Sequence, residues 1–380
     1  MKIKKYLVIA FALFLSSCSG GGSNTSPDPN GTTPDTTKWV QVVAGGHTCA
    51  ITDAGELWCW GANDYGQVGI GSNTQNCNDD VCRYPNQVTS NTSSKSSTTN
   101  NDVKWASVSV GNEYTCGIKT DGTVWCWGNN RGGQLGNGKY GEGEKELSPI
   151  QVGIDNNWKS VACAYNSTYA IKTDGSVWTW GGKTFAQIGN DTDWVAVSTG
   201  NDAVFSKTNF TLWSVSSGSN SNCAFLTPCQ INSSSDWRIS ATSFTNRFAI
   251  KSDGTLWDLT PKQIGADNDW ALVQGYCSIK TDGTLWCWGN NDYGQFGNGS
   301  TSDQQVDNPV QVGTENSWAF ITGGASNCGI KTDGTLWCWG YNFGGQLGIG
   351  TAGIDCDTDS TDYTCADEHS PRQVKITSTN

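Results

Sequence analysis

Short apolar stretches alternate with glycine-rich polar stretches along almost the whole chain, and residues 116–138 show this pattern most clearly. β-Branched and aromatic residues flank Thr120, Asp121 and Gly122, which indicates two short strands joined by a tight turn. A three-residue loop needs a positive φ at its last position, where glycine costs least. The pattern therefore predicts an antiparallel hairpin in which Cys116 lies opposite Cys126.

Nearly the same segment returns at residues 277–299 and 328–350, and with small changes at residues 49–71. Each of seven repeats opens on a tryptophan, has a second one after the predicted turn, and in five cases has a third two residues later. These positions account for all 19 tryptophans, so we interpret the tryptophans as core. The repeats begin near Trp39, Trp105, Trp158, Trp194, Trp237, Trp270 and Trp318. Seven units of about four short strands predict an all-β fold, a seven-bladed β-propeller over residues 39–376.

Cysteines occupy the two facing positions of the hairpin together or not at all. They are present as Cys49/Cys59, Cys116/Cys126, Cys277/Cys287 and Cys328/Cys338. They are replaced together in Tyr169/Thr179, Val204/Ser214 and Phe248/Asp258. Residues lost in pairs indicate a shared bond, and directly opposed cross-strand positions are within reach of a disulfide. Three close local pairs, Cys77/Cys82, Cys223/Cys229 and Cys356/Cys365, are predicted to bond as well, which leaves Cys163 as a buried unpaired thiol.

The N-terminus has the pattern of a targeting segment. Lys2, Lys4 and Lys5 precede a short apolar run at residues 6–15, which is too short for a comfortable membrane span. Residues 1–17 are therefore predicted to be a lipoprotein signal peptide that ends before a lipidated Cys18. Residues 18–38 would form a flexible tether. An ordinary signal peptide with an incidental cysteine is the alternative.

These features predict a bacterial cell-envelope protein held by a lipid anchor. Ser19 after the cysteine favours the outer membrane over the inner membrane. Export also fits the predicted disulfides, because such bonds persist outside the cytoplasm.

Charge and motif content argue against several function classes. The chain carries 35 acidic and 23 basic residues, a net charge of −12, so binding to nucleic acid is not expected. It has two histidines, His47 and His369, and no nucleophile elbow, zinc-protease motif or P-loop. We therefore expect neither an enzyme nor a bound cofactor or metal.

The repeat resembles that of the regulator of chromosome condensation family. The resemblance rests on a G-x-N-x-x-G-Q-x-G core at residues 61–69, 128–136, 289–297 and 340–348. Residues 181–189 carry a degraded copy, and repeats four and five lack it, so their blades are expected to be trimmed. The resemblance implies a seven-bladed propeller. One eukaryotic member is a nucleotide-exchange factor for a nuclear GTPase, but export and acidity make that activity unexpected here.

Variable segments follow this core at residues 72–84, 139–148, 300–308 and 351–370. Because equivalent positions in a ring lie on one face, these segments are predicted to form one arc of loops. We hypothesise that the arc binds a protein partner in the envelope or at the cell surface. A glycan ligand is a weaker alternative, and the simplest alternative is that the loops have no binding role. The acidic residues of the arc are Asp79, Asp80, Glu142, Glu144, Glu146, Asp355, Asp357, Asp359 and Asp362.

The alternative function is a calcium-dependent or enzymatic envelope factor that uses these acidic loops. Asp355, Asp357 and Asp359 have the spacing of a calcium loop. The segment departs from that motif because Ser360 replaces the turn glycine and Ala366 replaces the final glutamate. A solvated insert closed by Cys356–Cys365 is the preferred interpretation.

Overall fold

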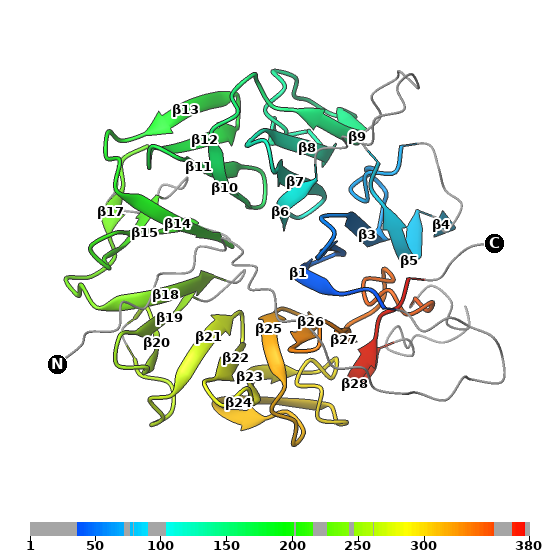
Figure 1. The fold of residues 1–380 in the computed structure, drawn as a ribbon, viewed down its shortest axis with the longest axis vertical. Helices are drawn as coiled ribbons and strands as arrows, with labels where there is room; N and C mark the ends of the chain where they lie inside the picture. The colour runs from blue at the N-terminus through cyan, green and yellow to red at the C-terminus, as the bar shows by residue number, and fades with distance from the viewer. Residues whose placement is uncertain are drawn as a thin grey trace, which may run out of the picture.

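A computed structural model describes residues 36–71, 77–78, 80–89, 104–200, 203–215, 226–242, 247–260, 262–352 and 367–376. Seven antiparallel sheets are arranged in a ring, and the first strand of each sheet lies nearest the centre (Figure 1). Each first strand begins at the opening tryptophan of a repeat. The predicted all-β seven-bladed propeller is therefore confirmed.

The strands of each blade follow one another from the centre of the ring outward. The first three blades contain β1 (Trp39–Ala44), β2 (His47–Thr52), β3 (Leu57–Ala62), β5 (Val81–Gln87) and β4 (Cys77–Asn78); β6 (Trp105–Val110), β7 (Tyr114–Lys119), β8 (Val124–Asn129) and β9 (Lys145–Gln151); and β10 (Trp158–Cys163), β11 (Thr168–Lys172), β12 (Val177–Gly181) and β13 (Thr184–Ile188). The other four contain β14 (Trp194–Thr199), β15 (Ala203–Lys207), β16 (Leu212–Val215) and β17 (Cys229–Gln230); β18 (Trp237–Thr242), β19 (Arg247–Lys251) and β20 (Leu256–Asp258); β21 (Trp270–Gln274), β22 (Cys277–Lys280), β23 (Leu285–Asn291) and β24 (Ser302–Gln311); and β25 (Trp318–Thr322), β26 (Ser326–Lys331), β27 (Leu336–Gly340) and β28 (Glu368–Gln373).

The hairpin at the middle of each blade has the register that the repeat predicts. Cys116 lies opposite Cys126, the Lys119 amide donates to the Thr123 carbonyl at 3.0 Å, and Gly122 has a φ of 81°. Disulfides join Cys49–Cys59, Cys116–Cys126, Cys277–Cys287, Cys328–Cys338 and Cys77–Cys82. Cys229 is also disulfide-bonded, whereas Cys223, Cys356 and Cys365 lie outside the described residues. Cys163 is buried and unpaired, as expected.

The fifth blade is trimmed in the part of it that the structure describes. It has three strands, and a single bridge between Trp257 and Gln263 stands where other blades have a fourth strand. The fourth blade has four strands, but its outermost strand, β17, is only two residues long. Both are the repeats without a G-x-N-x-x-G-Q-x-G core.

The segments predicted as variable loops are shorter than the sequence suggested. β24 occupies most of residues 300–308, because backbone pairing with β23 continues past a bulge as Gly289↔Val306 and Asn291↔Ser302. Similarly, β5 and β9 begin at Val81 and Lys145. Polar sequences such as 302–308 carry no alternating apolar signal, so the neighbouring strand determines their conformation.

We call the four copies of the G-x-N-x-x-G-Q-x-G core the Gly-Gln loops. In each of them, side chains of the loop form hydrogen bonds with backbone amides of the same loop. The Asn63 carboxamide oxygen accepts from the Val68 amide at 3.0 Å, and the Gln67 carboxamide oxygen accepts from the Tyr65 amide at 2.9 Å. The same two bonds recur in the loops at residues 128–136, 289–297 and 340–348. The recurring Asn and Gln of the repeat therefore fix the loop shape.

Each Gly-Gln loop holds the next blade through the backbone carbonyl of its glutamine. The Gln67 carbonyl accepts from Trp127 Nε1 at 2.9 Å and from Thr115 Oγ1 at 2.8 Å. A Cβ on Gly69 would lie 2.5 Å from Trp127 Nε1, so only glycine fits there. We call this contact the blade latch.

The ring closes by the same latch. The Gln346 carbonyl of the seventh blade accepts from Trp60 Nε1 at 2.9 Å and from Thr48 Oγ1 at 2.7 Å in the first. β1 and β28 belong to different sheets, so closure needs no shared blade.

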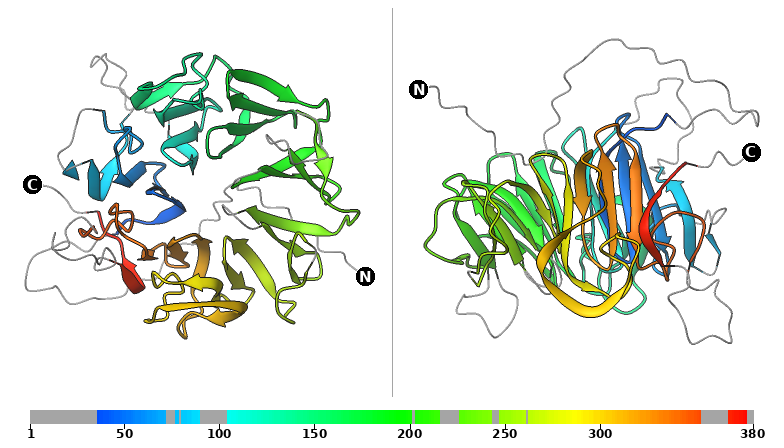
Figure 2. Two further views of the ribbon diagram at one scale, coloured as in Figure 1. Left: turned by 180° about the vertical axis from the view of Figure 1, so that it is seen from behind. Right: turned by 90° about the horizontal axis from the view of Figure 1, so that it is seen from below.

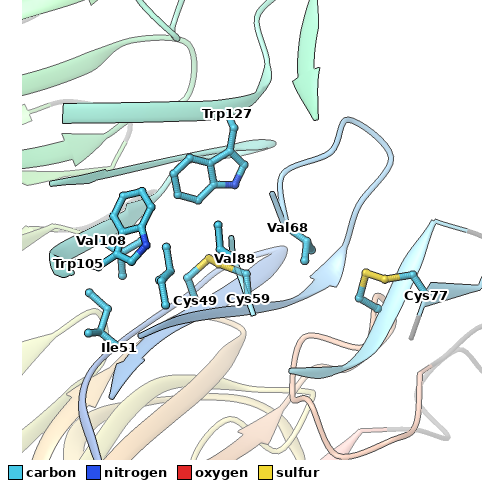
Figure 3. Close-up of a cluster of buried hydrophobic side chains, with 11 residues drawn as sticks. Cys49, Ile51, Cys59, Val68, Cys77, Val88, Trp105, Val108 and Trp127 are labelled. Atoms are coloured by element: carbon cyan, nitrogen blue, oxygen red, sulfur yellow. A yellow bond between two sulfur atoms is a disulfide. The ribbon is translucent and has the colours of Figure 1, made fainter. Parts of the chain in front are cut away.

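Apolar side chains fill the space between neighbouring blades. Figure 3 shows the cluster between the first and second blades, where the Cys49–Cys59 disulfide lies beside Val68, Val88 and Trp127. Trp127 and Trp105 meet edge to face, with ring centroids 5.6 Å apart. Such an arrangement is favourable for aromatic pairs.

Trp127→Phe should lower the free energy of unfolding by about 1 kcal/mol more than Trp180→Phe does, because a net buried hydrogen bond contributes roughly that amount. Trp180 is the matched control, since it is as deeply buried but its Nε1 has no partner among the described residues. Urea denaturation followed by tryptophan fluorescence measures the difference. Equal losses in the two variants would show that the latch bond adds nothing beyond packing.

Candidate functional site

Two faces of the disc are distinguished by which turns they carry. Because strands alternate in direction, the turns between first and second strands share one face with the Gly-Gln loops, and the Asp-Gly turns lie on the other. The first group is in direct contact, since the Ala62 amide donates to the Gly46 carbonyl at 3.2 Å. Figure 2 shows from the side that the strands run between these two faces. We call them the loop face and the hairpin face.

A central cavity of about 760 Å³ is surrounded by the innermost strands and by turns of the loop face. Its wall includes Val43, Val110, Val161 and Val197 from four successive blades. Among the described residues that line it there is no Asp, Glu, Lys or Arg. In a chain with a net charge of −12 this neutral interior suits an uncharged ligand group.

Aromatic side chains stand around this cavity on the loop face. Tyr293 and Tyr341 both line it, and their rings meet with centroids 4.9 Å apart. Phe343 stacks on Tyr341 at 6.4 Å. Tyr165, which also lines the cavity, is 53% exposed. Partly exposed tyrosines are characteristic of protein-binding surfaces.

Burial raises the pKa of the Tyr341 hydroxyl, and the nearby Tyr293 and Asp367 raise it further. The ring therefore remains a neutral hydrogen-bonding group at physiological pH.

Four of the acidic residues of the predicted arc, Asp80, Glu142, Glu144 and Glu146, lie within the described chain. Asp80 and Glu144 take equivalent positions, because their backbone carbonyls accept from the amide of the loop asparagine, at 2.7 Å from Asn63 and 2.9 Å from Asn130. Glu142 is exposed. Asp79, Asp355, Asp357, Asp359 and Asp362 lie outside the described residues.

Glu146 differs from the other three because its carboxylate already has partners. It is 3.3 Å from Lys139 Nζ and accepts from Asn137 Nδ2 at 3.2 Å. The structure thus places Asp80, Glu142 and Glu144 beside two Gly-Gln loops, and leaves Glu146 in a local ion pair.

The hairpin face carries a recurring cation site that the sequence interpretation missed. Lys331 Nζ lies 5.1 Å from the Trp318 ring centroid and 3.9 Å from that of Trp337, and it pairs with Glu315 at 2.6 Å. Six lysines lie between two tryptophans in this way: Lys119, Lys172, Lys207, Lys251, Lys280 and Lys331.

The signal for this site was present in the sequence. A lysine recurs two residues before the Asp of the turn, and an acidic residue recurs shortly before the opening tryptophan of several repeats. Since at least five of these lysines have a carboxylate partner, they stabilise the blades and offer no free positive patch.

The candidate chemical groups of the sequence were a metal-binding loop and two histidines. No group of three His, Cys, Asp or Glu side chains there could hold a metal ion. His47 is fully buried, and its Nε2 lies 2.6 Å from Thr115 Oγ1 of the next blade, so it acts as an inter-blade contact. The segment at residues 355–366, for which calcium binding was the alternative interpretation, and the predicted signal and lipid site at Cys18 lie outside the described residues. Within the described part of the chain, no helix has the length and hydropathy needed to cross a bilayer.

Comparison with known proteins identifies the family. The model of the regulator of chromosome condensation (RCC1) repeat matches residues 54–118, 121–171, 282–329 and 333–380, and a second model of this repeat matches residues 39–67 and 105–134. Since these segments cover more than half of the chain, it belongs to the RCC1 repeat family.

Individual relatives are distant. The chain is 24% identical over 318 residues to the ultraviolet-B receptor UVR8 of Arabidopsis thaliana, which covers 82% of this chain and 55% of the receptor. It therefore spans about half the length of that relative. Prp20p of Saccharomyces cerevisiae superposes with a TM-score of 0.68 at 16% identity, over 90% of this chain and 88% of that one. Human WBSCR16 superposes with a TM-score of 0.67 at 17% identity, over 84% and 94%. These two likenesses show the fold.

Stability should fall as the pH drops from 6 to 4, and His47 should cause most of the fall. Burial lowers the pKa of His47 from 6.5 to about 3, so below pH 6.5 the unfolded chain takes up a proton that the folded chain does not. The expected slope is about 1.4 kcal/mol per pH unit. Denaturant unfolding at half-unit pH steps measures it. His47→Gln should flatten the slope; an unchanged slope in this variant would contradict the assignment.

Proposed function

We propose that this chain is a protein-interaction propeller of the bacterial cell envelope, anchored by a lipid on Cys18, and that it binds its partner with the loop face. The observation that carries this proposal is the juxtaposition of an uncharged central cavity with half-exposed tyrosines around it. Aromatic rings there supply large contact area at a low cost in conformational entropy.

The family supports protein binding as the kind of activity. The structural relative Prp20p is described by its binding to Gsp1p and histones, and the same yeast protein was solved bound to Kap60. Those partners belong to those proteins. The shared feature that we infer for this chain is a propeller face that takes a protein.

The acidic residues around the Gly-Gln loops are proposed to steer the partner. Asp80, Glu142 and Glu144 lie on or beside the first and second blades; Asp79 directly precedes Asp80, and Asp355, Asp357, Asp359 and Asp362 belong to the corresponding segment of the seventh repeat. Charges at the rim of an interface mainly accelerate association and weaken with added salt. A partner with a basic patch fits this arrangement.

Replacing Tyr293 and Tyr341 together by serine should lower the yield of a crosslinked complex from intact cells about tenfold, because central aromatic residues dominate interface energies. The matched control is Phe210→Ser. Phe210 is 42% exposed but lies in the turn between β15 and β16, on the hairpin face. Photocrosslinking from several surface positions, followed by gel quantification, measures the yield. A complex that survives the tyrosine variant and is lost in Phe210→Ser would place binding on the opposite face.

Cys18→Ala should move the protein from the membrane fraction to the soluble fraction, because a lipidated cysteine would be its only anchor under this proposal. Metabolic labelling with a fatty-acid analogue and fractionation of the cells measure the change. The control is Cys163→Ala, which alters a cysteine buried in the propeller. Label that persists in the Cys18→Ala protein would rule out lipidation at this residue.

A further inference from the structure

The boundary between the fifth and sixth blades lacks the latch. β20 of the fifth blade ends at Asp258, whose carboxylate accepts from the amides of Thr260 at 3.0 Å and Lys262 at 2.7 Å. This tight turn leads directly to the bridge at Gln263, so the fifth blade has no Gly-Gln loop to offer to the sixth.

The donor that would meet such a loop is nevertheless present. Trp288 in β23 occupies the repeat position of Trp60, Trp127 and Trp339, whose Nε1 atoms all donate to a glutamine carbonyl. Trp288 is 3% exposed, its Nε1 has no acceptor within the described chain, and it lines the central cavity. A buried donor without an acceptor is unfavourable, so this position favours any group that supplies one.

The ring of Trp288 is held in place by its neighbours. Phe248 meets it edge to face at 5.2 Å and Tyr276 at 6.4 Å. An aromatic ring fixed on two sides presents its N–H in one direction, which reduces the entropy lost when an acceptor binds.

Trp180 provides an internal comparison. Its Nε1 also has no acceptor among the described residues, but the preceding blade carries a Gly-Gln loop, whose Gln134 carbonyl accepts from Thr168 Oγ1 at 2.8 Å. The Trp180 indole stacks on Phe185 instead, at 5.4 Å and 11°. Trp180 lies away from the cavity wall. A Gly-Gln loop therefore covers Trp180, where a Cβ on Gly136 would lie 3.0 Å from Nε1, whereas at Trp288 the acceptor loop is absent and the residue lines the cavity.

The other latches specify what chemistry fits at Trp288. In each of them the acceptor is a backbone carbonyl, and a glycine two residues later lies so close that a Cβ would be 2.5 Å from Trp60 or Trp127 Nε1 and 2.7 Å from that of Trp339. The described residues of the cavity wall are uncharged. A charged ligand would lose its hydration there without gaining a partner.

We propose that the cavity beside Trp288 binds an uncharged, glycine-containing turn of a partner protein, whose backbone carbonyl accepts from Trp288 Nε1 as a Gly-Gln loop does elsewhere in the ring. The partner turn supplies in trans the latch that the fifth blade lacks. This inference rests on the proposed function, since it names the segment that the loop face recognises.

The probe is a cyclic peptide with the sequence of residues 340–350, GYNFGGQLGIG, added to the purified chain labelled with ¹⁵N at its tryptophans. The indole N–H signal of Trp288, assigned through Trp288→Phe, should shift on titration. Calorimetry should show about a tenfold weaker affinity in Trp288→Phe, the loss expected for one buried hydrogen bond. Trp180→Phe is the matched control and should bind as the unmodified chain does.

Two further tests protect against a folding defect in Trp288→Phe. A peptide in which valine replaces the glycine that corresponds to Gly348, GYNFGGQLVIG, should bind the unmodified chain at least tenfold more weakly. Val197→Lys, which brings a charge to the cavity wall, should weaken peptide binding while leaving the unfolding midpoint within a degree or two.

The proposal is overturned if the peptide does not bind at millimolar concentration, if both peptides bind equally, or if Trp288→Phe binds with unchanged affinity. A neutral oligosaccharide such as maltohexaose that shifts the Trp288 signal where the peptide does not would replace the peptide ligand by a glycan. None of these peptide and oligosaccharide results changes the outcome of the crosslinking test, which tests the proposed function separately. Conversely, loss of the tyrosine dependence in cells would overturn the proposed function while the peptide shift at Trp288 remained.

Discussion

The carbonyl of one glutamine in each Gly-Gln loop holds the neighbouring blade, in three of the four loops through a tryptophan N–H together with a hydroxyl or amide. Because this carbonyl is buried, losing either donor costs more than an exposed hydrogen bond would. The loop must therefore be correctly shaped before the blades meet, and its own Asn and Gln side chains provide that shape. Gln346 extends the same contact to Trp60 and Thr48 and so closes the ring.

Charged side chains are arranged differently on the hairpin face and around the central cavity. On the hairpin face, lysines such as Lys280 and Lys331 lie between two indole rings and against carboxylates, so their charge is used internally. On the loop face, the described wall of the cavity carries no charge and the tyrosines have contact area to offer. A partner that enters the cavity therefore meets no charged side chain among its described wall residues, which is why recognition by shape and backbone hydrogen bonds suits it.

The sequence predicted features that local geometry determines and missed features that depend on another blade. Cys116 opposite Cys126, positive φ at Gly122 and the opening tryptophans all follow from one repeat, and the structure contains them. β24 was missed because its polar sequence pairs only by following β23. The six lysine sites were visible as a repeated residue, but their meaning needed the two flanking indoles to be seen together. The acidic residues were found, yet only the structure separates Glu144, beside a loop, from Glu146, in an ion pair.

Trp288 shows that a repeat that departs from the common pattern can create a candidate binding site in the next repeat. In a ring of equivalent blades, a donor and its acceptor come from different repeats, so loss of a loop in one repeat leaves an unpaired group in the next. A sequence comparison within one repeat sees Trp288 as an ordinary core residue, as it sees Trp339. Only the order of the blades shows that Trp339 faces Gln295 and that Trp288 faces a blade without such a loop. The trimmed fifth blade thus removes one internal contact and leaves, beside a neutral cavity, a buried donor without an acceptor among the described residues, whose direction the surrounding rings already fix.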